Sequence, residues 1–179
     1  MKFNIEVAGE KHCSFVAEIC KEMEESAKIR GTGIAKRSLE YIEKKVCEGK
    51  AVIALDEENH FAGFSYIECW GHESFVANSG LIVNPKYRRS GLARQIKKKI
   101  FALSRKKFPN AKIFSITTSL AVLKLNSELG YKPVTFSELT DDEDFWNGCE
   151  ACVNYDILQR NNRRMCLCTG MLYCPKIKS

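Results

Sequence analysis

The sequence lacks the long apolar run that a membrane-spanning helix requires. None of its hydrophobic stretches approaches the roughly 20 residues that cross a bilayer. Residues 1–8 also lack the apolar core of a secretory signal, and the chain contains no internal repeat or low-complexity segment. These absences exclude a helical membrane protein and a repeat array, so we expect a cytoplasmic globular protein that has no membrane partner.

Disulfide bonds are not expected, although the chain contains nine cysteines. The number is odd, no export signal accompanies it, and 179 residues can bury a core that needs no covalent cross-link. A hydrophobic content of 45% and a charged content of 28% are those of an ordinary globular protein. We therefore expect reduced thiols and a single domain over residues 1–179.

The basic residues lack the aromatic neighbours that single-stranded nucleic-acid-binding surfaces use. A net charge of +6 favours anionic partners in general, but it does not choose among nucleic acid, a phosphate-bearing cofactor and an acidic metabolite. Surfaces that bind nucleic acid interleave aromatic with basic side chains. Residues 90–108 carry most of the basic run but only Phe101 and Phe108 as aromatics. We expect no nucleic-acid partner.

Hydrophobic periodicity predicts a mixture of strands and helices. Strands or extended segments are expected at residues 1–8, 51–55, 61–70, 74–83, 112–118, 131–136, 151–158 and 165–173. Helices are expected at 9–29, 38–49, 90–108 and 119–130, with Ser119 as an N-cap. We expect the last two strands to form a hairpin, and most basic residues of the third helix, Lys97 among them, to lie on a solvated face.

One stretch joins a strand to a basic loop that contains glycine. Residues 81–94 read Leu-Ile-Val-Asn-Pro-Lys-Tyr-Arg-Arg-Ser-Gly-Leu-Ala-Arg. Small side chains at Ser90, Gly91 and Ala93 let an anion approach the backbone N–H groups at the start of the next helix, and the arginines add fixed charge. The pattern Arg88-x-x-Gly91-x-Ala93 after a strand resembles the acetyl-CoA-binding motif of the GNAT acetyltransferases.

The resemblance covers nearly the whole chain, because the order of the expected elements also agrees. It implies an α/β (α+β) fold with a mixed, mostly antiparallel central sheet of about seven strands and helices on both faces. It also implies acetyl-CoA, or another acyl-CoA, as the cosubstrate. Its pantetheine arm would pair with the backbone of Leu81, Ile82 and Val83. Its phosphates would be held by Arg88, Arg89, Ser90, Gly91, Leu92, Ala93 and Arg94, with Lys86 and Lys124 as weaker candidates.

The acid and base that the resemblance implies are not in their usual places. Many GNAT enzymes carry a tyrosine acid where this chain has Asn126, which can hydrogen-bond CoA but cannot protonate a thiolate. No carboxylate lies on residues 74–83, where the base often sits, so Glu68 is the nearest candidate by sequence. The alternatives are Glu73, or a water molecule held by Asn78 or Ser79. A mechanism in which positioning supplies most of the acceleration tolerates these departures.

A second resemblance concerns the acceptor. Thr117-Thr118 after a strand, followed by the turn at residues 129–134, resembles the same region of N-acetylglutamate synthase. An α-amino dicarboxylic acid needs fixed cations, and the loop between the first two helices supplies Arg30, Lys36 and Arg37. These features imply a small-molecule amine acceptor, the α-amine of an acidic amino acid such as glutamate, as in arginine biosynthesis. A peptide or protein N-acetyltransferase, a non-catalytic CoA sensor, and a homodimer stay open.

The C-terminal cysteines Cys149-x-x-Cys152 and Cys166-x-Cys168 have the ligand type and spacing of a structural zinc site. In the expected hairpin, however, the two pairs lie at separate places along the paired strands. At about 3.3 Å per residue they would be well over ~10 Å apart. Zinc–sulfur bonds are about 2.3 Å long, so one ion cannot reach both pairs. We therefore expect a protein without metal.

Overall fold

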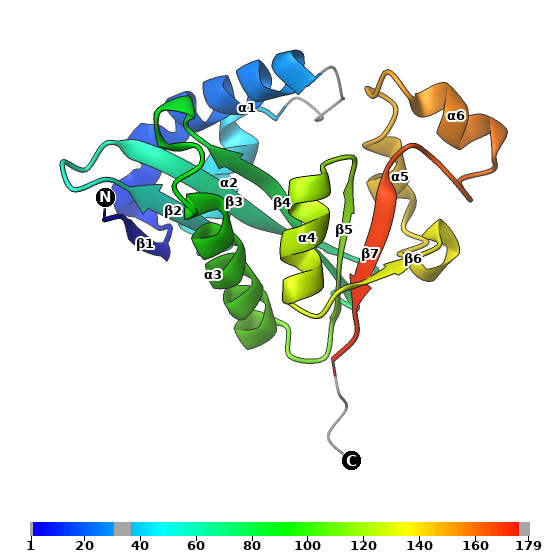
Figure 1. Ribbon diagram of the computed structural model, residues 1–179. Coiled ribbons are helices and arrows are strands. Elements are labelled where there is room, and N and C mark those ends of the chain that lie inside the picture. Colours follow the sequence, from blue (N-terminus) through cyan, green and yellow to red (C-terminus); the bar gives the residue numbers. More distant parts are fainter. Residues whose placement is uncertain (1, 31–36, 176–179) are drawn as a thin grey trace. The chain divides into compact units, whose positions relative to one another are not determined.

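The described chain is a mixed α/β fold around seven strands (Figure 1). The computed structural model describes residues 2–30 and 37–175. The strands are β1 (Asn4–Val7), β2 (Ala51–Leu55), β3 (Phe61–Trp70), β4 (Phe75–Val83), β5 (Lys112–Thr117), β6 (Lys132–Val134) and β7 (Thr169–Tyr173). The α-helices are α1 (Val16–Arg30), α2 (Leu39–Cys47), α3 (Leu92–Lys107), α4 (Leu120–Glu128), α5 (Glu143–Asn147) and α6 (Tyr155–Arg160). Short 3-10 helices are η1 (Glu10–Phe15), η2 (Pro85–Tyr87) and η3 (Phe136–Glu138).

The strands form a sheet in the order β1-β2-β3-β4-β5-β7-β6. β4 and β5 are parallel, whereas β1 with β2, β2 with β3, β5 with β7, and β6 with β7 pair in antiparallel fashion. The expected mixed, mostly antiparallel sheet is confirmed. The described residues divide into two compact units, the first made of residues 2–30, 37–67 and 78–103 and the second of residues 68–77 and 104–175.

Helices cover both faces of the strands in the first unit. A Cβ at Gly63 of β3 would lie 2.6 Å from Ile96 of α3, so this glycine lets α3 pack closely against one face. Tyr66, three residues further along β3, points to the opposite face, because side chains alternate along a strand. There its ring and Met23 of α1 surround the position that a Cβ of Gly80 would take.

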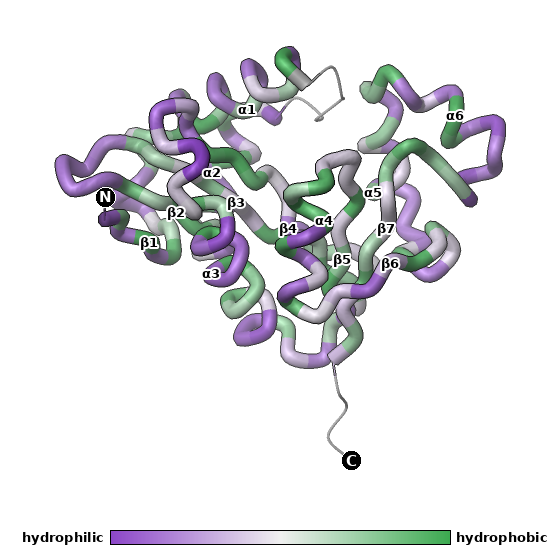
Figure 2. Tube along the Cα trace, in the orientation of Figure 1, coloured by the Kyte–Doolittle hydropathy of each residue, from purple (hydrophilic) through white to green (hydrophobic). Residues whose placement is uncertain are grey.

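The apolar stripe of α3 is buried as its spacing predicts, since Leu92, Ile96 and Ile100 are inaccessible to solvent. Figure 2 shows apolar and polar residues alternating along this helix. Lys97 departs from the prediction of a solvated face, because its side chain is only 1% exposed. It follows Ile96 directly and precedes Ile100 by three residues, and a lysine stem at the border of an apolar stripe packs as a hydrocarbon chain.

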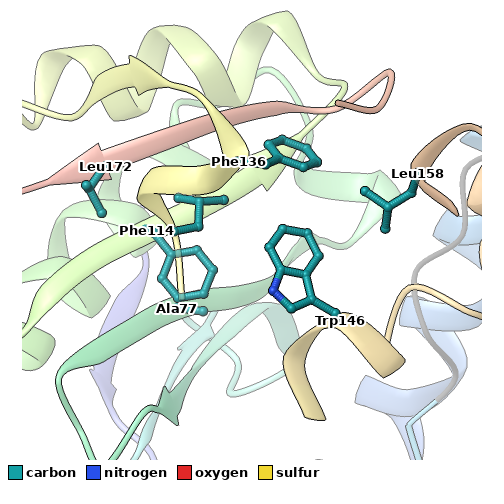
Figure 3. Packing of buried hydrophobic residues seen from close by; sticks show 7 residues of the cluster. Ala77, Phe114, Phe136, Trp146, Leu158 and Leu172 are labelled. Atoms are coloured by element: carbon teal, nitrogen blue, oxygen red, sulfur yellow. The ribbon is translucent and has the colours of Figure 1, made fainter. Parts of the chain in front are cut away.

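The second unit has a core of its own. Phe114 of β5 faces Leu172 of β7 across the antiparallel pair. These two residues pack with Ala77, Phe136, Leu139, Trp146 and Leu158 (Figure 3). The ring of Phe145 packs against this cluster and meets both Phe114 and Trp146 edge to face. The indole N–H of Trp146 donates a 2.8 Å hydrogen bond to the carbonyl oxygen of Thr140. Large buried aromatic side chains contribute strongly to the stability of a core such as this one.

The expected hairpin of strands 151–158 and 165–173 is wrong. Residues 151–154 form turns, Tyr155–Arg160 is the helix α6, and the later strand begins only at Thr169. β7 pairs with β5 from Ile113↔Tyr173 to Thr117↔Thr169 and with β6 on its other edge. The alternation of Val153, Tyr155 and Ile157 predicts a strand with one buried face. These side chains are not buried, however, because Val153 is exposed and the other two are half-buried.

The helices among residues 2–30 and 37–175 are all too short or too polar to cross a membrane.

Candidate functional site

The last part of β4 is irregular. β4 pairs in parallel with β5 through residues 75–77 and then continues to Val83. Gly80 interrupts it with a φ of +62°, and a Cβ at this position would clash with the ring of Tyr66. A left-handed residue inside a strand bends it and turns its backbone groups away from the regular ladder. Leu81, Ile82 and Val83 follow this bend, with Ile82 buried and the other two half-buried.

A tight turn then carries the chain away from β4. The side-chain oxygen of Asn84 accepts a 3.0 Å hydrogen bond from the backbone N–H of Lys86 and caps η2. Tyr87 is buried, its ring meets Phe3 edge to face at 5.4 Å, and its hydroxyl donates to Oδ2 of Asp56 at 2.5 Å. These contacts fix the residue that immediately precedes the basic loop, which comprises Arg88, Arg89, Ser90 and Gly91.

Asp56 is held in one orientation by several donors. Besides the Tyr87 hydroxyl, it accepts 2.9 Å hydrogen bonds from the backbone N–H groups of Glu58 and His60 in the turn between β2 and β3. The Tyr87 hydroxyl, followed by these N–H groups, holds the pKa of Asp56 well below its usual range. The Asp56 carboxylate is therefore ionised at neutral pH and anchors the turn.

The basic loop exposes both charge and backbone. All four of its residues are exposed, Arg89 has a φ of +65°, and Gly91 has a φ of +81°. The hydroxyl of Ser90 donates a 2.7 Å hydrogen bond to the carbonyl of Tyr87 and closes the loop. A Cβ at Gly91 would meet no atom within 4 Å, so the space above this backbone is open. A left-handed arginine is costly, and such residues cluster where backbone N–H groups must converge.

The helix α3 starts directly after this loop. Leu92 is buried and anchors the first turn, while Ala93 is half-buried and Arg94 is exposed. The first N–H groups of an α-helix have no acceptor within the helix, and its N-terminus carries a partial positive charge. Together with Arg88, Arg89 and Arg94, they make this end of α3 suited to a multiply charged anion.

Arg37 is the described member of the expected acceptor cations. Its Nε donates a 2.9 Å hydrogen bond to the hydroxyl of Tyr66, and its guanidinium lies 5.2 Å from the ring centroid of Tyr41. The Nζ of Lys45 lies 5.0 Å from the same ring. Of the other two cations, Lys36 and the side chain of Arg30 lie outside the described residues.

The remaining sequence candidates belong to the second unit. Glu68 is buried near the end of β3. Asn126 on α4 is fully buried, and neither its Oδ1 nor its Nδ2 has a hydrogen-bond partner within the described part of the chain. The hydroxyl oxygen of Thr117 accepts a 3.1 Å hydrogen bond from the backbone N–H of Ser119, and Thr118 is exposed.

The weaker candidates lie in varied surroundings. Glu73 is exposed in the turn between β3 and β4, and Asn78 is buried on β4. The carbonyl oxygen of Ser79 accepts a 2.9 Å hydrogen bond from the hydroxyl of Ser65. Lys86 and Lys124 are both exposed, and Nζ of Lys86 lies 3.9 Å from Asp56.

The prediction from sequence missed the residues that support the basic loop. Tyr87 was available as a signal, because one aromatic residue inside a polar, basic segment must either be exposed or pack on something. Its partner Asp56 lies 31 positions earlier, in a turn whose composition is that of any polar hairpin. Gly80 was also visible in the sequence, but only the structure shows that its φ is positive.

The fold of this chain is similar to that of known proteins. No protein-family model matches the sequence, and no curated protein matches it significantly. Solved structures do match, among them an acetyltransferase of the GNAT family from Staphylococcus aureus Mu50, with a TM-score of 0.69, 12% identity, and 98% of this chain and 100% of that chain covered. The chain has the GNAT acetyltransferase fold.

Two further GNAT-fold structures carry ligands. N-acetylglutamate synthase from Neisseria gonorrhoeae, complexed with coenzyme A and N-acetyl-glutamate, matches with a TM-score of 0.67 and 17% identity over 99% of this chain. The match covers 36% of the synthase chain, so this chain spans about a third of the synthase's length. A GNAT phosphinothricin acetyltransferase from Sinorhizobium meliloti, in complex with acetyl-CoA, matches with a TM-score of 0.65 and 14% identity, covering 98% of this chain and 89% of that one. At these identities the likeness establishes the fold.

Proposed function

We propose that this protein is an acyl-CoA-dependent N-acyltransferase that moves an acetyl or similar acyl group from CoA to a primary amine. The basic loop carries the proposal, because it joins a bent strand to the N-terminus of α3 within the GNAT fold and leaves open space above Gly91. Backbone N–H groups and arginines converging at a helix N-terminus suit a pyrophosphate.

The proposed cosubstrate contacts follow from this placement. The pyrophosphate would lie against residues 88–94, with Arg88, Arg89 and Arg94 supplying fixed charge. The pantetheine arm would pair with backbone groups of Leu81, Ile82 and Val83, which follow the bend at Gly80. Asn126 would offer its amide to the cosubstrate, and an amide buried without a partner supports this role, since such groups are costly unless a ligand satisfies them.

In the proposed reaction, the neutral amine attacks the thioester carbonyl and the CoA thiolate leaves. Glu68 is the candidate base that takes the amine proton, directly or through water. Asn126 cannot supply a proton to the thiolate, but a thiolate is a weak enough base to leave without being protonated first. Most of the acceleration would then come from holding amine and thioester in contact.

We further propose that the acceptor is the α-amine of a small acidic amino acid such as glutamate. The fold shared with a synthase whose structure holds N-acetyl-glutamate supports this class, as do Thr117 and Thr118 by their sequence resemblance. Arg37 supports it physically, because two tyrosines orient its guanidinium and an oriented guanidinium can bind a carboxylate through two parallel hydrogen bonds.

Release of CoA from acetyl-CoA, measured across a panel of free amino acids that includes glutamate and ornithine, tests the proposal. We expect turnover on an acidic amino acid, and Arg37→Met should raise KM for that acceptor by about tenfold or more, since each lost charged hydrogen bond contributes at least that factor. KM for acetyl-CoA should not change. Lys45→Met is the matched control, because it removes the other cation that lies over Tyr41.

The two alternatives give different results in the same assay. A peptide or protein N-acetyltransferase would release CoA with peptide N-termini and remain inactive on free amino acids. A CoA sensor would bind acetyl-CoA in calorimetry but show no turnover on any amine. Either result would refute the proposed acceptor, and absence of acetyl-CoA binding would refute the proposed function as a whole.

A further inference from the structure

Four cysteines gather in the second unit, in a segment that the acyl-transfer site does not use. Cys149 and Cys152 lie in the turns that follow α5, and Cys166 and Cys168 lie just before β7. The expected hairpin would have kept the two pairs apart. Because α6 replaces one of its strands, the chain instead folds back and brings Cys152 and Cys166 to the backbone of one residue, Asn154.

Asn154 links the two pairs directly. Its backbone N–H donates a hydrogen bond to Sγ of Cys152 at 3.5 Å, and its carbonyl oxygen accepts one from Sγ of Cys166 at 3.9 Å. The backbone N–H of Cys152 donates to the carbonyl of Cys149 at 2.9 Å and curls the first pair into a turn. Asn154 therefore lies between Cys152 of the first pair and Cys166 of the second.

The same cysteines pack on the core of the second unit. Cys149, Cys166 and Cys168 are half-buried against the cluster that contains Phe136, Trp146 and Leu158, and Figure 3 shows these last three side chains lying together. The thiols therefore lie where bulk water is partly excluded.

The segment that carries these cysteines has few other means of holding its conformation. Between residues 149 and 168, Leu158 is the one buried side chain, and the apolar residues Val153, Met165 and Leu167 are exposed. A short segment with little buried apolar area commonly depends on a disulfide or a metal ion.

We propose that Cys149, Cys152, Cys166 and Cys168 bind one structural zinc ion. Four thiolates from a Cys-x-x-Cys and a Cys-x-Cys pair form the soft, tetrahedral ligand set that zinc prefers. Zinc would displace the four thiol protons, and the resulting complex would carry two negative charges.

Binding requires the cysteine side chains to rearrange. Among the described residues, only Asp56, Glu58 and His60 have three ligand atoms within 4.8 Å of one another, and those carboxylates lie in an exposed turn. The four sulfurs must therefore move closer together around the ion, through rotation of the cysteine side chains. The sequence argument against a metal used the distance between the two cysteine pairs in the expected hairpin, and that hairpin does not form. The ion would be structural and would take no part in acyl transfer.

Elemental analysis of the full chain, purified without added metal or chelator, tests this proposal. We expect about one zinc per chain, falling to near zero in Cys149→Ser and Cys168→Ser. Cys174→Ser is the matched control, because Cys174 is an exposed thiol just beyond β7, and it should keep the zinc. Exchange of the zinc for Co²⁺ should give the intense visible absorption of a tetrahedral thiolate complex.

A second measurement uses only the wild-type protein, in case the serine variants fail to fold. Alkylation of the native protein followed by mass spectrometry should modify Cys47 and Cys174 and spare the four cysteines, which should become reactive after chelation. Zinc-free protein with four freely reactive thiols would overturn the proposal. Disulfides within the cluster, or zinc that persists in both serine variants, would also overturn it, and neither result bears on the proposed acyltransferase activity.

Discussion

The Tyr87 hydroxyl and Oδ2 of Asp56 lie 2.5 Å apart, and this contact ties the turn between β2 and β3 to the residue that precedes the basic loop. The contact is a charge-assisted hydrogen bond, because the hydroxyl donates to an ionised carboxylate. Oδ2 of Asp56 also lies 3.9 Å from Nζ of Lys86. The loop that carries the proposed cosubstrate site is therefore fixed from a neighbouring hairpin.

This contact predicts a pH-dependent loss of stability. The pKa of Asp56 is lower in the folded protein than the value of 3.8 for a free side chain, so its ionised form stabilises the fold above about pH 4. That stabilisation is lost as the pH falls further, because the unfolded chain takes up the proton first. Asp56→Asn should lower the melting temperature at pH 7, and the difference from wild type should shrink as the pH falls below about 4.

Glu58→Gln is the control, because Glu58 is an exposed carboxylate in the same turn. Thermal melts of the three proteins from pH 7 to pH 2.5 make the comparison. A difference between wild type and Asp56→Asn that stays constant with pH would refute the role of the ionised carboxylate.

Substitutions at Gly91 distinguish the effect of backbone strain from that of excluding the ligand. Gly91→Glu places a negative charge and bulk in the open space, and should weaken acetyl-CoA binding by about 100-fold or more if a pyrophosphate lies there. Gly91→Asn keeps a neutral side chain that tolerates a positive φ and should have a much smaller effect. Calorimetry with acetyl-CoA measures both.

Gly130→Glu is the matched control for strain, since Gly130 has a φ of +89° and a Cβ there would make ordinary contact with Tyr173. It should lower stability without the same loss of affinity. Unchanged acetyl-CoA affinity in folded Gly91→Glu would refute the basic loop as the phosphate site.

Gly80 should be far less tolerant of substitution than an ordinary glycine. A Cβ at this position would clash with the ring of Tyr66 and come within 3.4 Å of Met23, at a φ of +62°. Gly80→Ala should therefore cost roughly 2 kcal/mol or more of unfolding free energy. Gly9→Ala is the control, because Gly9 has a φ of −156° and open space around it. Equal losses in urea denaturation would show that the bend in β4 is not strained.

The sequence predicted the elements whose pattern is local. The buried stripe of α3 and the side-chain cap at Ser119 follow from spacing within a few residues, and both are confirmed. The partner of β7 could not be read locally, because β5 lies more than 50 positions earlier and both its register and its neighbour depend on packing. The alternation at residues 151–158 predicted a strand, but residues 155–160 form the helix α6, because no neighbouring strand pairs with this segment in the described structure.

The candidate site shows the same division. The basic loop could be predicted because glycine, arginine and the following helix are adjacent in the sequence. The positive φ of Arg89 and the contact of Tyr87 with Asp56 could not, since each depends on backbone geometry and on a distant turn. Lys97 was placed on the wrong face because a lysine in an amphipathic pattern reads as polar, whereas its stem is apolar.

The burial of Lys97 predicts that replacing it with an apolar residue increases the stability of the protein. Burial lowers its pKa from 10.5 to about 8, and this difference corresponds to about 3 kcal/mol. Between these two pH values the unfolded chain holds a proton that the folded chain has released, so stability should rise with pH across this window. Lys97→Met should therefore be more stable than wild type at pH 7, and the advantage should shrink towards pH 10.5.

Lys98→Met is the control, because Lys98 is the exposed neighbour on the same helix. Chemical denaturation at pH 7 and near pH 10 measures both variants. Lower stability of Lys97→Met at pH 7 would mean that the contacts of the ammonium group outweigh the cost of burying it.

Substitution of Asn126 should have opposite effects on stability and on activity. A fully buried amide whose oxygen and nitrogen both lack partners in the described structure costs folding free energy, of about 1–3 kcal/mol for each unsatisfied group. Asn126→Ala removes that cost and adds helix propensity within α4, so the variant should be at least as stable as wild type. If the amide binds the cosubstrate, the same variant should raise KM for acetyl-CoA by about tenfold.

Ser127→Ala is the control, because Ser127 is the exposed neighbour on α4 and its hydroxyl donates a 3.0 Å hydrogen bond to the carbonyl of Leu123 in the same helix. Thermal melts and steady-state kinetics on the same preparations measure both effects. A destabilised variant with normal KM would mean that Asn126 is structural, whereas a stable variant with a raised KM would place its amide against the cosubstrate. A purely structural role cannot produce the second combination, because removing a structural contact lowers stability first.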